Sequence, residues 1–467
     1  MSTKDKLNIP RHPLPTENPD IRRKVFNEVA LGFDEHLAVE EAMRCIQCKR
    51  PYCMEGCPVA IDIPKFIQQI TERDYLSAAR TIRATNSLPS ICGRVCPQEM
   101  QCEKTCILAK KGLPVAIGAL ERFVSDFERE YGSAQILARQ KSTDKRIAII
   151  GSGPAGLTAA GYLVAQGHEI TVFEALHEAG GVLIYGIPEF RLPKFLVRNE
   201  VHTLEKMGVQ FSLNTLVGRT ITIDELFGEG YKAVFLGPGA GTPIFMNLPG
   251  ENLCGVLSAN EFLTRVNLMK AFQFPKYDTP VYCGKRVAVI GGGNTAMDAA
   301  RTAIRFNPEA VYIIYRRSEK ELPAKIDEVH HAQEEGVQFM YLTSPVAYNG
   351  DSKGWVQEME CIKMELIEPD ESGRRRTRPI HGSNFKLSVD TVIVAIGAQS
   401  NDLLIRTTQG LETTNDGYLI VDPNTQMTSR AGVFAGGDIA SYEATVISAM
   451  GQGRIAGKAI HEYVMQK

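Results

Sequence analysis

The chain has 467 residues, of which 44% are hydrophobic and 23% are charged, and its formal net charge is −2. With a common domain size of about 150 residues, this length predicts roughly three domains. The near-neutral charge gives no electrostatic reason to expect a nucleic acid or an anionic membrane as partner. No apolar run approaches the length of a membrane span, and the N-terminus lacks the apolar core of a signal peptide. We therefore expect a cytoplasmic globular protein.

The N-terminal part is predicted to be helical. Residues 1–25 are polar and rich in proline, which indicates an extended arm. Between residues 26 and 130, apolar side chains recur at helical spacing in DEHLAVEEAMRC, IPKFIQQITERDYLSAARTIRAT and VAIGALERFVSDFERE. This segment is poor in strands, so we expect a separate helical domain.

Eight of the eleven cysteines lie in this helical segment. Four form CIQCKRPYCMEGC, followed by Pro58, with a middle gap two residues wider than in a bacterial ferredoxin. The other four stand in CGRVCPQEMQCEKTC. A disulfide framework would be unusual in a long chain without a signal peptide. Iron–sulfur clusters are favoured, and zinc or mixed roles are the alternative, because only one C-x2-C pair is present.

At Arg146 the pattern changes to strand, turn, helix and strand. RIAII runs into GSGPAG, which puts three glycines in G-x-G-x-x-G spacing directly after an apolar strand. Such glycines allow a tight turn, a close approach of the backbone to a pyrophosphate, and close helix–strand packing. Glu174 ends the next strand, where an acid suits a ribose hydroxyl. The segment is therefore predicted to bind a dinucleotide.

The same pattern recurs about 140 residues later. RVAVIGGGNTAMD places Gly291, Gly293 and Ala296 after a second apolar strand. The following strand, AVYIIY, ends in Arg316 and Arg317 instead of an acid. An arginine can bind a 2′-phosphate, which an acid would repel, so this site is predicted to hold NADP(H).

Two further motifs favour FAD at the first site. EAGGVLIYGIPEFRLPK (178–194) follows Glu174 as in many two-dinucleotide flavoproteins, and GVFAGGDIA (432–440) resembles their closing flavin motif, with Asp438 on the ribityl chain. A helix from about Thr445 would point its N-terminus at the flavin. Hydride transfer between nicotinamide and flavin needs no acid–base pair, so no catalytic side chain is expected.

The candidate nucleotide-contacting residues fall in two groups. For FAD they are Gly151, Ser152, Gly153, Pro154, Ala155, Gly156, Glu174, Gly181, Leu183, Arg191, Val217, Gly437, Asp438, Thr445 and Val446. For NADPH they are Gly292, Gly293, Asn294, Thr295, Asp298, Arg316, Arg317 and Gly397.

The expected fold class is α/β, with an N-terminal α-helical iron–sulfur domain followed by two Rossmann-like dinucleotide-binding domains. The expected boundaries are 1–130 for the helical domain, 141–280 and 391–467 for the two parts of the FAD domain, and 281–390 for the NADP(H) domain. The FAD domain would therefore be discontinuous, with the NADP(H) domain inserted.

Taken together, the motifs resemble one family. The cysteine run at 45–58, LPSICGRVCPQEMQCEKTC, IGALERF, GSGPAG, YGIPEFRLPK, GGGNTAMD and VFAGGD make residues 40–460 similar to the small subunit of glutamate synthase and its relatives. These relatives include the N-terminal half of dihydropyrimidine dehydrogenase and the large subunit of NADH-dependent ferredoxin:NADP oxidoreductase, also called sulfide dehydrogenase. The resemblance implies two [4Fe–4S] clusters with interleaved ligands.

The family pattern assigns ligands to each cluster. One cluster would take Cys45, Cys48, Cys53 and Cys106. The other would take Cys57, Cys96, Cys102 and Glu121, which leaves Cys92 as a bystander.

The ends of the helical segment resemble the ferredoxin-linked member more closely, through VFNEVALGFDEHLAVEEAMRCIQC and the compact CILAKKGLPVAIGALER. That member implies FAD as an electron-bifurcating centre, ferredoxin as one acceptor, and a heterodimer with a smaller flavin/[2Fe–2S] subunit that reduces NAD. The alternative is a small subunit of glutamate synthase, which would pass NADPH electrons to an amidotransferase large subunit. A scaffold with degenerate sites is disfavoured by the intact glycines and cysteines.

Overall fold

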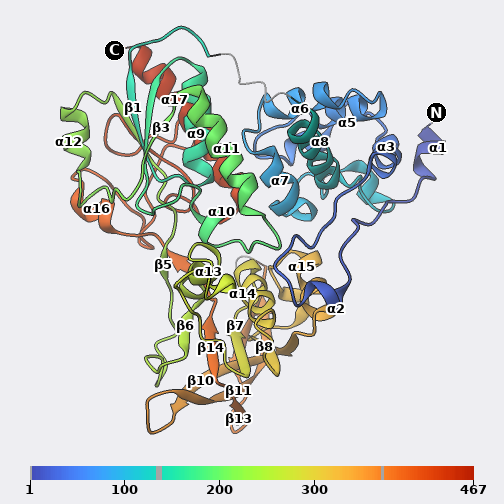
Figure 1. Cartoon of the computed structure of the whole chain (residues 1–467), viewed down its shortest axis with the longest axis vertical. Helices are drawn as coiled ribbons and strands as arrows, with labels where there is room; N and C mark the ends of the chain where they lie inside the picture. The colour runs from blue at the N-terminus through green and yellow to red at the C-terminus, as the bar shows by residue number, and fades with distance from the viewer. Residues whose placement is uncertain (1–2, 133–138, 370–372, 467) are drawn as a thin grey trace.

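The computed structural model describes residues 3–132, 139–369 and 373–466. Figure 1 shows a helical body and two sheets flanked by helices, with an N-terminal arm that runs from the helical body to the lower sheet. The predicted α/β fold class with an N-terminal helical domain is confirmed. Residues 133–138, in the predicted gap between the helical and sheet domains, lie outside the described residues.

The helical domain consists of short helices joined by tight turns. Its helices are α1 (Thr3–Leu7), α2 (Pro19–Arg22), α3 (Glu35–Met43), α4 (Tyr52–Glu55), α5 (Ile63–Thr71), α6 (Tyr75–Arg83), α7 (Pro89–Val95) and α8 (Ile117–Tyr131), with 3₁₀ helices η1 (Gln98–Met100) and η2 (Ile107–Lys110). Asp34, Asp62 and Asp74 begin α3, α5 and α6, and each carboxylate accepts a hydrogen bond from a backbone N–H of the first turn. This capping satisfies donors that a helix start leaves unpaired.

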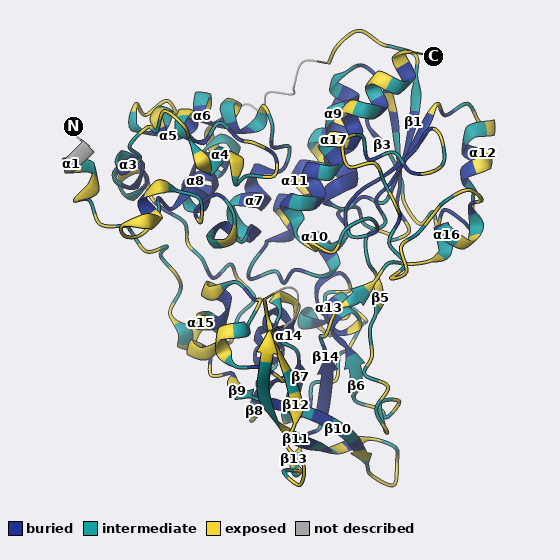
Figure 2. Cartoon of the chain, turned by 180° about the vertical axis from the view of Figure 1, so that it is seen from behind, coloured by how far each residue is buried: buried dark blue, intermediate teal, exposed yellow. Residues whose placement is uncertain are grey.

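The first sheet domain has five parallel strands in the order β16-β4-β1-β2-β3. The strands are β1 (Arg146–Ile150), β2 (Glu169–Phe173), β3 (Gln210–Ser212), β4 (Ala233–Leu236) and β16 (Val433–Ala435). The helices are α9 (Pro154–Ala165), α10 (Val182–Tyr185), α11 (Lys194–Met207), α12 (Ile223–Gly228), α16 (Leu403–Thr407) and α17 (Val446–Met465). Figure 2 shows β1 and α9 as largely buried, and α17 as buried along one face.

The second sheet domain repeats this topology in the order β6-β14-β7-β8-β9, again all parallel. Its strands are β6 (Val256–Ser258), β7 (Arg286–Ile290), β8 (Ala310–Tyr315), β9 (Gln338–Tyr341) and β14 (Thr391–Val394). Its helices are α13 (Ala259–Asn267), η3 (Ala271–Gln273), α14 (Asn294–Ile304), η4 (Glu319–Glu321) and α15 (Ile326–Glu334). The internal repeat thus corresponds to two sheets of equivalent strand order.

An antiparallel layer extends the second sheet domain. It is formed by β10 (Thr343–Gly350), β11 (Val356–Pro369), β12 (Arg375–Pro379) and β13 (Phe385–Ser388). A two-stranded pair, β5 (Thr242–Pro243) with β15 (Ala398–Gln399), joins the two chain crossings between the sheet domains.

The boundary predicted at residue 281 falls too late. Strand β6, at Val256–Ser258, pairs with β14 and α13 packs on α14, so both belong to the second sheet domain. A single strand of three residues carried too little periodicity to be assigned from the sequence. We propose that the inserted domain runs between β5 and β15, about 244–397, with the helical domain at 3–132 and the first sheet domain on either side of the insertion.

The helical domain and the first sheet domain share one hydrophobic core. Ile67 and Ile91 of the helices belong to the same buried cluster as Ile147 of β1 and Met450 of α17. Helices α17 and α9 approach so closely that a Cβ at Gly453 would stand 2.3 Å from the carbonyl oxygen of Ala155. The two domains therefore form a single packed unit.

The N-terminal arm docks on the second sheet domain. Phe26 stacks on Phe272 with ring centroids 4.5 Å apart and also contacts Phe190 and Phe306. The fully buried Arg22 forms an ion pair of 3.1 Å with Glu335. The arm is extended only between the short helices α1 and α2, which the sequence did not indicate, and it connects the helical domain to the second sheet domain.

Candidate functional site

A continuous cleft lies where the two sheet domains and the helical domain meet. It is lined by every predicted FAD contact except Gly156 and Leu183, and by Asn294, Thr295, Asp298 and Gly397 from the predicted NADPH set. The other predicted NADPH residues, Gly292, Gly293, Arg316 and Arg317, do not line it. In parallel α/β sheets, ligands bind at the carboxyl ends of the strands, which is where both glycine loops lie.

The first glycine loop has the geometry of a phosphate cradle. Gly151 has φ +95°, and a Cβ there would stand 2.3 Å from the carbonyl oxygen of Gly237. A Cβ at Gly156 would stand 2.0 Å from the carbonyl oxygen of Gly151. Gly153 differs, because a Cβ there would meet no protein atom within 4 Å. Gly151 and Gly156 are thus required by packing, whereas Gly153 leaves room for a ligand in front of the N-terminus of α9.

Glu174 fixes the shape of this loop. One carboxylate oxygen accepts hydrogen bonds from the backbone N–H of Ser152, at 3.0 Å, and from its hydroxyl. The Ser152 hydroxyl oxygen in turn accepts from the Gly180 N–H at 2.9 Å. The acid predicted to meet a ribose therefore also joins the glycine loop to the segment that begins at Gly180.

The C-terminal motif closes the cleft from the other side. Gly437 and Asp438 line it, and burial raises the pKa of the Asp438 carboxyl. Thr445 begins α17, and its hydroxyl oxygen accepts from the Ser448 N–H at 3.2 Å. The N-terminus of this long helix thus faces the cleft through Thr445 and Val446, as the sequence predicts.

The segment 183–194 carries two buried cations that hold it in place. Arg191, predicted as a FAD contact, binds the Asp298 carboxylate at 2.6 and 2.7 Å, so one predicted FAD residue and one predicted NADPH residue form a wall of the cleft. Lys194 was missed by the sequence analysis. Its ammonium donates to the carbonyl oxygens of Leu183, Ile187 and Leu192, and burial lowers its pKa to about 7.

The second glycine loop repeats the first. Gly291 has φ +139°, and a Cβ there would stand 2.2 Å from the carbonyl oxygen of Ala395. A Cβ at Gly293, the residue before α14, would again meet open space. Gly292 plays a different part, because its Cβ would collide with the ring of Tyr315 at 2.6 Å. The opening at Gly293 has the form of a second nucleotide cradle.

Arginines gather at the end of β8. The Arg316 side chain reaches solvent, but its partial desolvation and the neighbouring charges of Arg317 and Arg374 lower its pKa. Arg317 is largely buried, and its Nε donates to the carbonyl oxygen of Arg375 at 2.7 Å. Arg374 comes from the antiparallel layer, and the run RRR at 374–376 was the sequence signal that could have indicated it. Such a group of guanidinium groups suits a 2′-phosphate.

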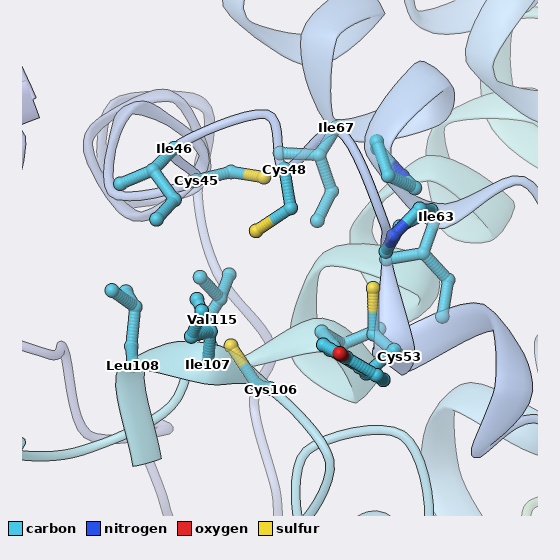
Figure 3. Close-up of a pocket in the computed structure, with 14 residues that line it drawn as sticks. Cys45, Ile46, Cys48, Cys53, Ile63, Ile67, Cys106, Ile107, Leu108 and Val115 are labelled. Atoms are coloured by element: carbon cyan, nitrogen blue, oxygen red, sulfur yellow. The ribbon is translucent and has the colours of Figure 1, made fainter. Parts of the chain in front are cut away.

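Four cysteines surround an outer cavity in the helical domain. Figure 3 shows the sulfur atoms of Cys45, Cys48, Cys53 and Cys106 directed into one space, with apolar side chains around it. Burial, followed by the nearby Cys45, Cys106 and Cys48, raises the pKa of the Cys53 thiol to about 12. Such a group would ionise only if a positively charged centre compensated it. We call this the outer site.

A second group lies deeper. Cys57, Cys96, Cys102 and Glu121 act electrostatically on one another. Burial raises the pKa of Glu121 to about 8, which a hydrogen bond of 2.6 Å from the Asn86 amide opposes. We call these four residues, which the family pattern predicts as ligands, the inner site; Cys92 also interacts electrostatically with Cys57, Cys96 and Glu121.

Cys92 lies beside the inner site. Its sulfur is fully buried, 3.4 Å from the Met450 sulfur and 3.7 Å from the Asn86 side-chain oxygen. It thus packs against α17, and its place outside the ligand set stays a prediction.

The spacing of these side chains favours an iron–sulfur cluster over zinc. Within residues 3–132, 139–369 and 373–466, no three His, Cys, Asp or Glu side chains converge closely enough to hold a single metal ion. Zinc would require sulfur ligands at about 2.3 Å around one atom. Four sulfurs around an open space suit a four-iron cluster better.

The inner site adjoins the cleft. Val95 and Pro97, on either side of Cys96, line the cleft together with Ala155 and Ala449. Gly451 of α17 packs on the carbonyl oxygen of Pro58, which follows Cys57, and a Cβ there would stand 3.0 Å from it. The inner site therefore adjoins the cleft, whereas no residue that lines the outer site also lines the cleft.

Comparison with known families agrees with this organisation. Residues 22–133 match the model of dihydropyrimidine dehydrogenase domain II, 4Fe-4S cluster, and residues 145–453 match that of the pyridine nucleotide-disulphide oxidoreductases. Fold and sites thus define a pyridine nucleotide-disulphide oxidoreductase preceded by a 4Fe–4S domain.

Relatives share nearly the whole chain. The glutamate synthase [NADPH] small chain of Halomonas elongata is 38% identical over 447 residues, which cover 95% of this chain and 94% of that one. The corresponding small chain of Escherichia coli is 36% identical over 465 residues, covering 98% and 97%. The NADP(+)-dependent formate dehydrogenase subunit beta of Moorella thermoacetica is 38% identical over 437 residues, covering 89% of this chain and 60% of that one. The chain belongs to the family of the glutamate synthase small chain.

Solved structures share the fold of the sheet domains. FprA of Mycobacterium tuberculosis superposes with a TM-score of 0.57 at 20% identity, over 69% of this chain and 85% of that one. Thioredoxin reductase of Lactococcus lactis gives 0.53 at 22% identity, over 69% and 100%.

The chain is an NADPH-dependent FAD and iron–sulfur oxidoreductase. The open cradles at Gly153 and Gly293 and the converging sulfurs of the outer site fit these cofactors. None of the helices among the described residues is both long and apolar enough to cross a membrane.

Proposed function

We propose that the chain is the NADPH-oxidising large subunit of a ferredoxin:NADP oxidoreductase. Its FAD would be the electron-bifurcating centre, with ferredoxin as one acceptor and a smaller flavin/[2Fe–2S] subunit, which reduces NAD, as partner. When bound, FAD takes a hydride from NADPH, and 4Fe–4S clusters carry electrons singly.

One observation carries this proposal: the inner site adjoins the cleft, whereas the outer site is partly open to the surface. Cys96, whose neighbours Val95 and Pro97 line the cleft, and Cys102 are buried, whereas all four cysteines of the outer site are partly exposed. Two sites in series would carry electrons from the cleft to a separate protein at the surface. A substrate that is reduced in the cleft itself would not need these two sites.

The residues of the chain would have distinct roles. The glycine loops at Gly153 and Gly293 would admit the two pyrophosphates, and Arg316 would bind the 2′-phosphate of NADPH. We assign Cys45, Cys48, Cys53 and Cys106 to the outer cluster, and Cys57, Cys96, Cys102 and Glu121 to the inner cluster. The support for this assignment is the shared cavity of the outer four and the mutual electrostatic interactions of the inner four.

The surface over the outer site favours an acidic acceptor. Tyr52, which lines the outer site, lies under the Arg50 guanidinium at 5.0 Å and the Lys110 ammonium at 5.9 Å. Lys49 and Lys111 are exposed next to them. A basic, partly apolar surface on a chain of net charge −2 would steer a negatively charged redox protein to this point.

The second candidate is a small subunit of glutamate synthase. The observation in its favour is that the small chains from Halomonas elongata and Escherichia coli match over 94% and 97% of their length. In that case the outer site would face an amidotransferase subunit.

Steady-state turnover separates the candidates. We expect NADPH oxidation by the complex to need ferredoxin and NAD⁺ together. We also expect Lys110→Glu to raise the KM for ferredoxin and to make that KM less dependent on salt concentration. Lys353→Glu, on the distant turn between β10 and β11, is the matched control. A requirement for glutamine and 2-oxoglutarate would instead select the second candidate and overturn the first.

A further inference from the structure

The second sheet domain touches the helical domain through a short loop beside the inner site. In this loop, which precedes α15, the Lys325 ammonium donates to the side-chain oxygen of Gln98 at 3.2 Å. The next residue, Ile326, donates its backbone N–H to the Glu99 carboxylate at 3.3 Å. Gln98 and Glu99 follow Cys96 by only two and three residues. The loop therefore reaches the segment that bears an inner-site sulfur.

The same loop is attached to the second nucleotide cradle. The backbone N–H of Lys325 donates to the Asn294 side-chain oxygen at 2.8 Å. Asn294 is the first residue of α14, directly after Gly293, and it lines the cleft. Because its oxygen is occupied by Lys325, the amide N–H₂ of Asn294 remains to face a nucleotide. A ligand that fixes Asn294 would also fix the loop.

Gln98 is held as firmly on its other side. Its side-chain N–H₂ donates to the carbonyl oxygen of Cys92 at 3.2 Å, and the side chain is buried against Gly118. The chain of contacts from Asn294 through Lys325 to Gln98 thus ends at the backbone between two cysteines.

Lys325 brings a positive charge to a site rich in anions. Its side chain is 14% exposed. The acidic groups nearby are Asp327, whose exposed carboxylate pairs with the Lys325 ammonium at 3.9 Å, Glu328, Glu99 and Glu103, whose carboxylate also pairs with Arg11 at 2.9 Å. The ammonium is connected to the segment that bears Cys96 through Gln98, whose side chain also contacts the carbonyl oxygen of Cys92.

We propose that Lys325 is a positioning residue that couples NADP(H) binding at Asn294 to the reduction potential of the inner iron–sulfur cluster. The proposal rests on the cluster assignment made under the proposed function. One-electron reduction adds one negative charge to the cluster, and a nearby ammonium favours the state with more negative charge. The electron would come from NADPH by way of the flavin and would leave to the outer site, so no further reductant would be needed. By linkage, reduction of the cluster must change nucleotide affinity by the same factor.

The test is an EPR-monitored redox titration of the full-length holoenzyme, with and without 2′-monophosphoadenosine 5′-diphosphoribose. This probe carries the phosphates of NADP⁺ but has no nicotinamide to be reduced. In Lys325→Met, we expect the reduced-to-oxidised ratio of one cluster at fixed potential to fall roughly tenfold, which is about 59 mV for a one-electron couple. The other cluster should keep its midpoint. In the wild type, the probe should raise the inner midpoint, because it holds the ammonium on Gln98, and in Lys325→Met this rise should vanish.

Two variants serve as controls. Lys325→Arg keeps the charge and should retain both the midpoint and the response to the probe. Lys320→Met removes an exposed lysine from the neighbouring η4 and should behave as the wild type.

The outcomes separate this inference from the proposed function. If both clusters are present and Lys325→Met leaves both midpoints and the probe response unchanged, the coupling is wrong while the cluster assignment stands. An equal shift in Lys320→Met would also overturn it, because the effect would then be general charge. If no second cluster signal exists, the cluster assignment itself fails.

Discussion

Replacement of Gly293 by alanine should separate nucleotide binding from folding. The residue has φ −87° and ψ 179°, an extended conformation that alanine adopts freely. A Cβ there meets no protein atom within 4 Å. The methyl group would instead project into the space that we assign to the pyrophosphate of NADP(H).

The expected magnitudes follow from this geometry. Stability should change by no more than about 0.5 kcal/mol, as for a substitution that creates neither strain nor collision. Affinity for NADP⁺ should fall at least tenfold, or about 1.4 kcal/mol, because the methyl group blocks the close backbone approach. Gly291→Ala should behave in the opposite way. An added Cβ at this position would stand 2.2 Å from the carbonyl oxygen of Ala395, and φ is +139°, which alanine rarely adopts. The substitution should therefore destabilise the fold by about 1–3 kcal/mol.

The assay is NADP⁺ titration of the purified flavoprotein, together with urea unfolding and flavin content. Gly228→Ala, at a second glycine with open space beside it but at the end of α12, is the matched control for the substitution itself. A dissociation constant for Gly293→Ala within about twofold of the wild type would refute the assignment of this opening to the nucleotide.

The remaining predictions concern charge. Glu121→Gln keeps the size of the side chain and removes an anionic oxygen, so the signal or midpoint of one cluster should change in an EPR redox titration. Unchanged spectra and potentials would remove Glu121 from the ligand set. Arg316→Ala should raise the KM for NADPH roughly tenfold with little effect on that for NADH; equal effects on both would contradict a 2′-phosphate contact. Burial and the neighbouring charge of His461 lower the pKa of His168 to about 4, so the folded state holds this ring neutral. Its contribution to stability is therefore present above the ordinary value of about 6.5 and declines as pH falls toward 4. Unfolding in urea at pH 7.5 and 5 should show this decline in the wild type and a smaller one in His168→Gln; equal declines would argue against it.

The features that local sequence determines were predictable. Strand, glycine turn and helix follow one another within about 25 residues in both sheet domains, so Gly151 and Gly291 could be identified without any tertiary information. The α/β class and the nature of the cofactors followed from these patterns. The cysteine groups were predictable only through family resemblance, because their spacing does not say which sulfurs share a site.

The features that depend on distant contacts were not predictable. Lys194 acts through carbonyl oxygens of a folded loop, and Lys325 contacts Gln98 across 227 positions of the chain. Arg374 reaches Arg316 only because the antiparallel layer folds back over β8. Strand β6 belongs to a sheet whose other strands begin nearly 30 residues later. In each case the residue type is common and the partner is remote, so no local pattern marks it.

The docking of the N-terminal arm has a consequence for the order of synthesis. Arg22 is made among the first residues, yet its ion-pair partner Glu335 follows 313 positions later. Phe26 likewise waits for Phe272 and Phe306 before its ring can be buried. Domains generally fold as units while the ribosome is still adding residues. Here the N-terminal arm cannot dock until the second sheet domain has been synthesised. A fusion or a cut at the N-terminus should therefore disturb the second sheet domain more than the helical domain.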